Sequence, residues 1–127
     1  MTTKILIVDD SSTTLLMEEM LLRKYTSFDI VQARNGQEAV QKAIAEQPDL
    51  ILMDVVMPKM DGFAACREMR RQEKLRDTPI ILVTSRGEPQ NVEMGFESGC
   101  NDYLTKPVES NELLQMVNGY LTANKAN

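Results

Sequence analysis

Five short runs of apolar residues recur along the chain, separated by longer stretches in which apolar and polar positions follow a helical period. The runs have the length of β-strands, and three of them are continuous rather than alternating. They comprise residues 5–8, 28–33, 50–53, 80–83 and 103–104. Continuous apolar strands are typical of a parallel sheet that is covered on both faces. We therefore expect helices on both faces of such a sheet.

The stretches between the runs carry apolar residues three or four positions apart, as amphipathic helices do. The positions are Thr14, Met17 and Leu21; Ala39, Val40, Ala43 and Ile44; Phe63, Cys66 and Met69; Val92 and Phe96; Leu113, Leu114, Val117 and Leu121. Strand and helix thus alternate five times. This alternation predicts an α/β fold, a doubly wound (βα)5 sandwich of flavodoxin-like type with a five-stranded parallel sheet, in one domain over residues 1–127.

Local signals mark some of the predicted helix ends. Asn35, with Glu38 three residues later, resembles a capping box. Pro89 suits a first helical turn, and Gly99 suits a helix end. Asp61 and Gly62 are interpreted as a cap and a conformationally permissive turn that open the third helix.

Composition and charge narrow the function. With 127 residues, 43% hydrophobic and 26% charged, the chain has the make-up of one ordinary globular domain. Its net charge of -5 and its scattered basic residues argue against direct nucleic-acid binding, because phosphates would repel it. We see no cleavage site and no apolar run of membrane-spanning length. We therefore expect no membrane insertion and a cytoplasmic location.

The content of cysteine and histidine excludes several kinds of chemistry. Cys66 and Cys100 show no metal or redox spacing, so we expect two free thiols, with Cys66 in the core. The chain contains no histidine, which removes histidine acid–base catalysis and the usual zinc sites. Any phosphohistidine in its reactions must come from another protein.

Polar residues follow the apolar runs at the end where a doubly wound sheet binds ligands, beyond the carboxyl ends of its strands. Asp9 and Asp10 follow the first run, and Asp54 follows the third. Thr84 follows the fourth run and Lys106 lies just beyond the fifth. We expect three carboxylates, a hydroxyl and an ammonium group to converge on one edge of the sheet.

Clustered carboxylates repel one another unless a cation neutralises them, and oxygen-only ligands favour Mg²⁺. A metal site beside Lys106 and the Thr84 hydroxyl suits phosphoryl transfer, whose catalysis is mostly positioning and charge neutralisation. Asp54 would be the nucleophile, forming an acyl phosphate.

Taken in this order, the motifs resemble the receiver domain of two-component response regulators, and the layout is similar to the single-domain chemotaxis regulators. The matching segments are residues 9–10, 54–62, 84–85 and 102–107. The resemblance covers the chain from Lys4 to about Leu121.

The resemblance assigns a role to each polar residue of the predicted site. Asp54 matches the phosphoacceptor, and Lys106 matches the residue that pairs with the phosphoryl group. Asp10, Asp54 and the backbone carbonyl of Val56 match the direct ligands of Mg²⁺. Asp9 matches an acid that acts on the metal largely through water.

The resemblance also implies a switch and its partners. Thr84 matches the switch hydroxyl, Tyr103 matches the aromatic residue that follows it, and the Lys106–Pro107 peptide bond would be cis. The phosphoryl donor would be a histidine kinase or a histidine phosphotransfer protein. Phosphorylation would change the affinity of the fourth helix, fifth strand and fifth helix for a downstream target protein, and a phosphorylation-dependent dimer is a further option. We expect no enzymatic activity other than catalysis of its own phosphorylation and slow autodephosphorylation.

Two positions depart from the polar pattern of the fast-cycling chemotaxis regulators. Val56 lies two residues after Asp54, and Arg86 lies two residues after Thr84. Both positions flank the path of the hydrolytic water in the family. We hypothesise that apolar Val56 cannot orient this water, so that the acyl phosphate is long-lived.

Other readings of the same residues remain open. Asp9 and Asp10 could form a solvated turn and helix cap, and Tyr103 could be a simple edge-strand residue. The fold could be a phosphorylation-independent scaffold. A Mg²⁺-dependent aspartyl phosphohydrolase is a weaker alternative, because an acid two residues after the nucleophile is absent. A flavin mononucleotide site would need a Gly-rich loop after the first strand, which is also absent.

Overall fold

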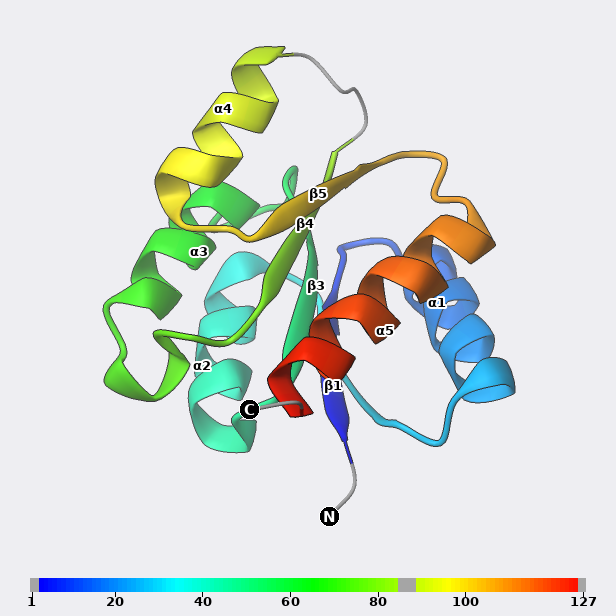
Figure 1. Cartoon of the computed structure of the whole chain (residues 1–127). Helices are drawn as coiled ribbons and strands as arrows, with labels where there is room; N and C mark the ends of the chain where they lie inside the picture. The colour runs from blue at the N-terminus through cyan, green and yellow to red at the C-terminus, as the bar shows by residue number, and fades with distance from the viewer. Residues whose placement is uncertain (1–2, 85–88, 126–127) are drawn as a thin grey trace.

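The computed structural model describes residues 3–84 and 89–125, which form a five-stranded parallel sheet with helices on both faces (Figure 1). The strands are β1 (Lys4–Val8), β2 (Asp29–Ala33), β3 (Leu50–Asp54), β4 (Ile80–Thr84) and β5 (Asp102–Thr105). The helices are α1 (Ser12–Tyr25), α2 (Gly36–Glu46), α3 (Gly62–Arg70), α4 (Pro89–Ser98) and α5 (Ser110–Lys125), with a short 3₁₀ helix at Glu73–Leu75. The predicted doubly wound (βα)5 fold is confirmed.

The order of strands in the sheet is β2-β1-β3-β4-β5, and all neighbouring pairs are parallel. The chain moves outward from β1 to β2, then returns past β1 to β3 and continues in the other direction. The order therefore reverses between β1 and β3, where Val8 lies beside Met53. In open α/β sheets, the crevice at such a switch point is the usual place for a ligand.

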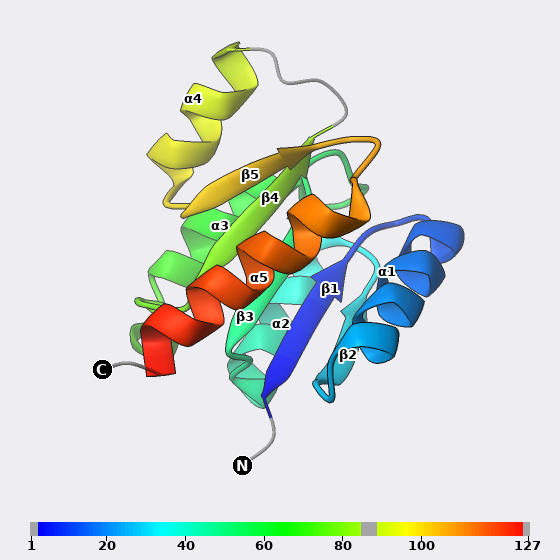
Figure 2. The same cartoon turned by 45° about the vertical axis from the view of Figure 1, so that its right-hand side comes forward.

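The two faces of the sheet have separate cores. Helices α1 and α5 cover one face, and α2, α3 and α4 cover the other (Figures 1 and 2). Every residue of β3 and β4 is buried, and so are four of the five residues of β1. The edge strands β2 and β5 are only partly covered. This explains why the three central strands read as continuous apolar runs.

Side chains just before three helices satisfy backbone N–H groups that a helix start leaves without an internal partner. The oxygen-to-nitrogen pairs are Ser11 with Thr14 at 3.2 Å, Asn35 with Glu38 at 2.8 Å, and Asp61 with Ala64 at 2.8 Å. The caps predicted at Asn35 and Asp61 are confirmed. Gly99 directly follows α4 with a φ of +104°, a conformation that glycine adopts readily.

Gly62 is needed for close packing at the end of β3. A Cβ atom at this position would lie 2.5 Å from the backbone oxygen of Asp54 and 2.9 Å from the Cα of Val55. Its N–H donates to the Val55 carbonyl oxygen at 2.8 Å. Gly62 opens the third helix, as predicted, but the predicted reason is wrong, because close packing rather than conformational freedom requires glycine here. The missing side chain lets α3 begin directly against the strand that carries Asp54.

Two helices each expose one apolar residue of the predicted buried stripe, while Thr14, Leu21 and Val92 of these stripes are partly buried. In α1 the buried residues are Leu15, Glu18 and Leu22, whereas Met17, on the predicted stripe, is 65% exposed. An acidic residue occupies the middle of the buried stripe, so apolar residues alone place that stripe one position too early. In α4, Phe96 is 48% exposed. Its ring contacts Tyr103 on the edge strand instead of entering a core.

Two further expectations can be compared with the structure. Cys66 and Cys100 are both free, as predicted, and Cys66 is buried without exposed surface, as predicted. Cys100 is buried as well. Among the helices of the described residues, none is both long and apolar enough to cross a membrane.

Candidate functional site

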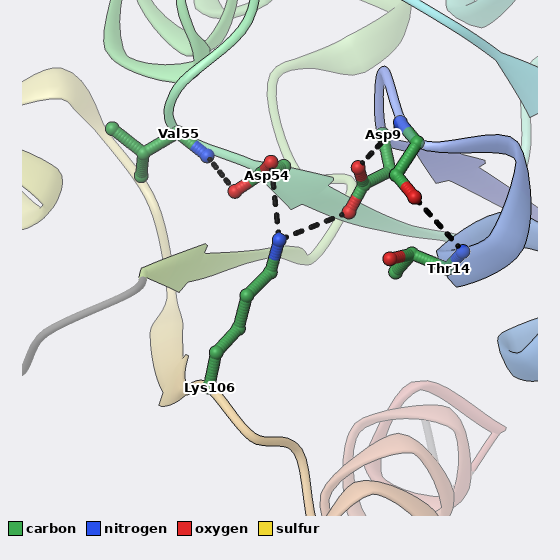
Figure 3. Close-up of polar contacts among 6 residues, drawn as sticks. Asp9, Thr14, Asp54, Val55 and Lys106 are labelled. Carbon is green, nitrogen blue, oxygen red and sulfur yellow. Dashed lines mark hydrogen bonds and ion pairs between the residues drawn. The ribbon is translucent and has the colours of Figure 1, made fainter.

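Polar side chains from three strand ends meet beside the switch point of the sheet (Figure 3). Asp9 follows β1, Asp54 is the last residue of β3, and Lys106 follows β5. Only 2% of Asp9 and 5% of Asp54 is exposed, whereas Asp10 faces solvent. The structure therefore brings these four predicted site residues to one edge of the sheet.

The Lys106 ammonium group bridges the two buried carboxylates. Its Nζ atom lies 3.2 Å from Asp9 Oδ2 and 3.2 Å from Asp54 Oδ2 (Figure 3). Burial alone would lower the pKa of Lys106, but the negative charges of Asp54 and Asp9 outweigh it and the pKa is raised. Lys106 therefore stays charged, and its ammonium group lies beside the two negatively charged carboxylates of Asp9 and Asp54.

Backbone N–H groups hold the second oxygen of each buried carboxylate. Asp54 Oδ1 accepts a hydrogen bond from the Val55 N–H at 2.9 Å, and Asp9 Oδ1 accepts one from the Ser11 N–H at 2.9 Å. Even so, the pKa of Asp54 is raised, first by burial and then by the negative charge of Asp9. Lys106 thus offsets only part of the electrostatic cost of this site.

The acidic cluster has the composition of a site for a hard divalent cation. Carboxylate oxygens of Asp9, Asp10 and Asp54 can all lie within 4.8 Å of one another. These donors are oxygen only, which fits Mg²⁺ better than a softer transition metal. Burial and the charge of Asp9 raise the pKa of Asp54, and a bound cation would oppose both effects, so the residues fit such an ion. The Val56 side chain is 70% exposed beside Asp54, and the role of its carbonyl stays a prediction.

Thr84 lies at the carboxyl end of β4, next to the strand that carries Lys106. Its side chain is almost fully buried, and Thr84 pairs with Thr105 in the register of β4 and β5. Its carbonyl oxygen accepts a hydrogen bond from the Lys106 backbone N–H at 2.7 Å. The backbone thus links the predicted switch residue directly to Lys106. Ser85 and Arg86, which follow it, lie outside the described residues.

Tyr103 and the Lys106–Pro107 bond lie on the strand and turn that carry Lys106. The Lys106–Pro107 peptide bond is cis, as the resemblance implies. Tyr103 is partly buried, and its ring makes an edge-to-face contact with Phe96 of α4, with centroids 6.1 Å apart and planes at 85°. This contact joins the predicted switch aromatic to the helix beside it.

Glu18 is a charged residue near the site that the sequence did not single out. It lies on α1, only 8% exposed, and its Oε1 atom has no hydrogen-bond partner among residues 3–84 and 89–125. Burial, together with the negative charges of Asp9 and Asp54, raises its pKa to about 8, against the opposing effect of Lys106. The sequence does contain a signal for this burial. Glu18 lies three residues after Leu15 and four before Leu22, which is the helical spacing of a stripe that is otherwise apolar.

Comparison with known proteins identifies the family. The chain matches the response regulator receiver domain family over residues 5–118, which is most of its length. This chain belongs to that family. The predicted resemblance and fold are thereby confirmed.

Three relatives illustrate the range of the family. Protein PilH of Pseudomonas aeruginosa is 38% identical over 118 residues, which cover 93% of this chain and 97% of PilH. The DNA-binding dual master transcriptional regulator RpaA of Synechocystis is also 38% identical over 118 residues, but this chain spans about half of its length, 48%. The crystal structure of the receiver domain of a Pseudomonas aeruginosa sensor histidine kinase, with a magnesium ion coordinated in its active site cleft, has a TM-score of 0.89. That structure is 33% identical and covers 96% of this chain and 99% of its own.

Proposed function

We propose that Asp54 accepts a phosphoryl group from the phosphohistidine of a histidine kinase or a histidine phosphotransfer protein, in a Mg²⁺-dependent reaction. The observation that carries the proposal is the Lys106 ammonium group, 3.2 Å from the carboxylates of both Asp9 and Asp54. A receiver domain implies such a kinase and a downstream effector as partners. The chain would be a signalling acceptor rather than an enzyme that turns over a substrate.

In the transfer, an Asp54 carboxylate oxygen attacks the phosphorus atom of the donor. The new oxygen–phosphorus bond forms as the phosphorus–nitrogen bond breaks, and the electron pair remains on the departing imidazole, which takes a proton from solvent. Lys106 neutralises the phosphoryl oxygens as they arrive beside Asp54, and the Thr84 hydroxyl donates to one of them. No histidine of this chain is needed, which agrees with the absence of histidine from the sequence.

The three aspartates are the groups that would hold the metal. Asp10, Asp54 and the Val56 carbonyl would bind Mg²⁺ directly, and Asp9 would act largely through water. When bound, the ion would neutralise the carboxylates and the oxygens of the transferring phosphoryl group. The carboxylate arrangement and the raised pKa of Asp54 support this assignment.

Phosphorylation would change partner affinity through the surface formed by α4, β5 and α5. The acyl phosphate adds negative charge at Asp54, which draws the Thr84 hydroxyl toward it. Tyr103 would follow Thr84, and its ring contact with Phe96 offers a route to α4. The result is a shift between two populations of this surface rather than a chemical product. A phosphorylation-dependent dimer is a further part of the proposal.

The first experiment uses acetyl phosphate as the donor, with Mg²⁺ or with a chelator, and follows the intact mass. We expect a Mg²⁺-dependent gain of one phosphoryl group in the wild type and none in Asp54→Ala. Asp77→Ala, which removes an exposed aspartate outside the cluster, is the matched control and should behave as the wild type. No gain in the wild type would favour the phosphorylation-independent scaffold. Turnover of a small phosphate ester would favour the phosphohydrolase.

The exposed Val56 side chain carries the proposal of a long-lived acyl phosphate. An apolar side chain cannot hydrogen-bond the attacking water, so orientation of that water is lost. We expect Val56→Asn to speed dephosphorylation about tenfold and Val56→Leu to leave it nearly unchanged. Loss of the phosphoryl mass with time measures both rates. A half-life of seconds in the wild type would contradict the proposal without affecting the assignment of Asp54.

A further inference from the structure

Helices α1 and α5 cover the same face of the sheet (Figure 2). A pocket of about 540 Å³ lies between them. Leu21 of α1, with Val108 and Leu113 on the α5 side, contributes apolar walls. Glu18 and Lys106 are its two charged lining residues. A mostly apolar pocket of this size with few polar groups has the character of a small-molecule site.

Glu18 is the unsatisfied group of this pocket. More than nine-tenths of the residue is buried, and Oε1 is the one buried side-chain oxygen or nitrogen without a hydrogen-bond partner in the part of the chain that the structure describes. A buried polar atom without a partner has lost its hydrogen bonds to water and has gained none in the protein. Apolar residues occupy the stripe on either side of it, at Leu15 and Leu22. A carboxyl at this position therefore lowers stability unless something binds to it.

The charges around Glu18 favour a positively charged partner. Asp9 and Asp54 both act on it as negative charges, and Lys106 is the opposing positive charge. The Lys106 ammonium group is already bonded to those two aspartates, so it does not serve as the partner of Glu18. The net field at the pocket thus attracts a cation in addition to Lys106. Such a cation beside Glu18 would favour the ionised carboxylate over the neutral form that the raised pKa favours in its absence. A planar amidinium or guanidinium group is suited to this place, because it is weakly hydrated and pairs with both oxygens of a carboxylate.

We propose that the pocket binds a small amphipathic cation, whose amidinium or guanidinium head pairs with Glu18 while its apolar body lies between α1 and α5. The proposal does not depend on phosphoryl transfer to Asp54. Because Lys106 and Pro107 belong to the wall, a bound ligand would contact the turn that carries the site lysine. Binding and events at the acidic site should then influence each other reciprocally.

Benzamidine is the probe, and benzamide is its neutral counterpart of nearly the same shape. Each is titrated into the full chain while amide chemical shifts are followed by two-dimensional NMR. We expect benzamidine to shift amides of α1 and of the turn before α5, and to bind at least about tenfold more tightly than benzamide. Glu18→Gln should abolish that preference. Glu19→Gln, which removes the neighbouring charge that pairs with Arg23 and Gln32, should retain it.

Three results would overturn the proposal. The first is that Glu18→Gln prefers benzamidine over benzamide as strongly as the wild type does, and the second is that benzamidine shifts amides at exposed acidic residues all over the protein. The third is that Glu19→Gln loses the preference as fully as Glu18→Gln does. If N-acetylarginine amide binds as tightly as benzamidine, the apolar body is not recognised, and an arginine of a partner protein is favoured instead. Should Glu18→Gln fold poorly, Glu18→Leu provides the same comparison, because it matches the apolar residues of the buried stripe.

Discussion

Helices α1 and α3 both pack an inward face against the sheet, yet only for α3 are all the apolar residues that the sequence assigns to this face buried. In α3 the predicted residues Phe63, Cys66 and Met69 are all buried. In α1 the predicted residue Met17 is exposed, and the buried stripe contains Glu18. A pattern of apolar residues locates a buried face only where every inward position is apolar.

The positions of the two helices explain the difference. Helix α3 packs against α2 and α4 and into a core cluster that also contains Leu82 and Cys100. Helix α1 begins three residues after Asp9, so its inward face adjoins both a core and the acidic site. A residue on that face can serve the electrostatics of the site rather than packing alone. Three experiments make the comparison sharper.

The largest effect should come from removing one buried side chain from each helix. Leu15 of α1 is 2% exposed and Met69 of α3 has no exposed surface. Truncation to alanine leaves a cavity as well as losing buried apolar area, so Leu15→Ala and Met69→Ala should each reduce the free energy of unfolding by about 2–5 kcal/mol. Urea denaturation measures both. A loss well below this range for Leu15→Ala alone would mean that α1 is packed more loosely than α3.

A smaller effect, which depends on pH, should separate Glu18 from its apolar neighbours. Its pKa is about 8 in the folded protein and near the ordinary value of 4.5 when unfolded. The folded state therefore holds the proton more tightly. The stability that comes from neutral Glu18 is complete below pH 4.5 and is lost as the pH rises towards 8, by up to about 1.4 kcal/mol per pH unit.

Comparison of wild type with Glu18→Gln isolates this contribution, because the amide does not titrate. With a chelator present, we expect the two proteins to differ little near pH 4.5 in this respect, and Glu18→Gln to become relatively more stable by a few kcal/mol by pH 8. Thermal or urea unfolding at a series of pH values gives the difference. A constant difference across the series would show that Glu18 does not titrate in this window.

The smallest effect is expected at Met17, which the apolar pattern assigns to the buried face. Because Met17 is 65% exposed, Met17→Ala should change the free energy of unfolding by no more than about 0.5 kcal/mol. The same urea titration as for Leu15→Ala provides the measurement. A loss similar to that of Leu15→Ala would restore the predicted face and contradict the structure.

Much of the fold and the outline of the site can be predicted from the sequence, because two local patterns point to the same arrangement. Continuous apolar runs mark strands covered on both faces, and the first polar residue after each run lies at the carboxyl edge of the sheet. These rules together placed Asp9, Asp54 and Thr84. The resemblance to receiver domains then supplied the roles of these residues and the cis bond before Pro107, which no periodicity could give.

What the sequence did not reveal depends on neighbours that are distant along the chain. Position 62 requires glycine because a Cβ atom there would lie 2.5 Å from the backbone oxygen of Asp54. Phe96 is exposed because its partner, Tyr103, belongs to an edge strand. Glu18 looks like any surface acid until burial and the acidic cluster are known. In each case the deciding contact is tertiary.

The bond between Lys106 and Asp9 joins residues that are 97 positions apart. During synthesis, domains fold as units while the chain grows from its N-terminus. A nascent chain can therefore contain all three aspartates, with most of the sheet, and still lack the ammonium group that bridges them. A growing chain cannot complete this cluster before the segment that follows its last strand has emerged from the ribosome, and a fragment released before that point would carry the acids without their lysine.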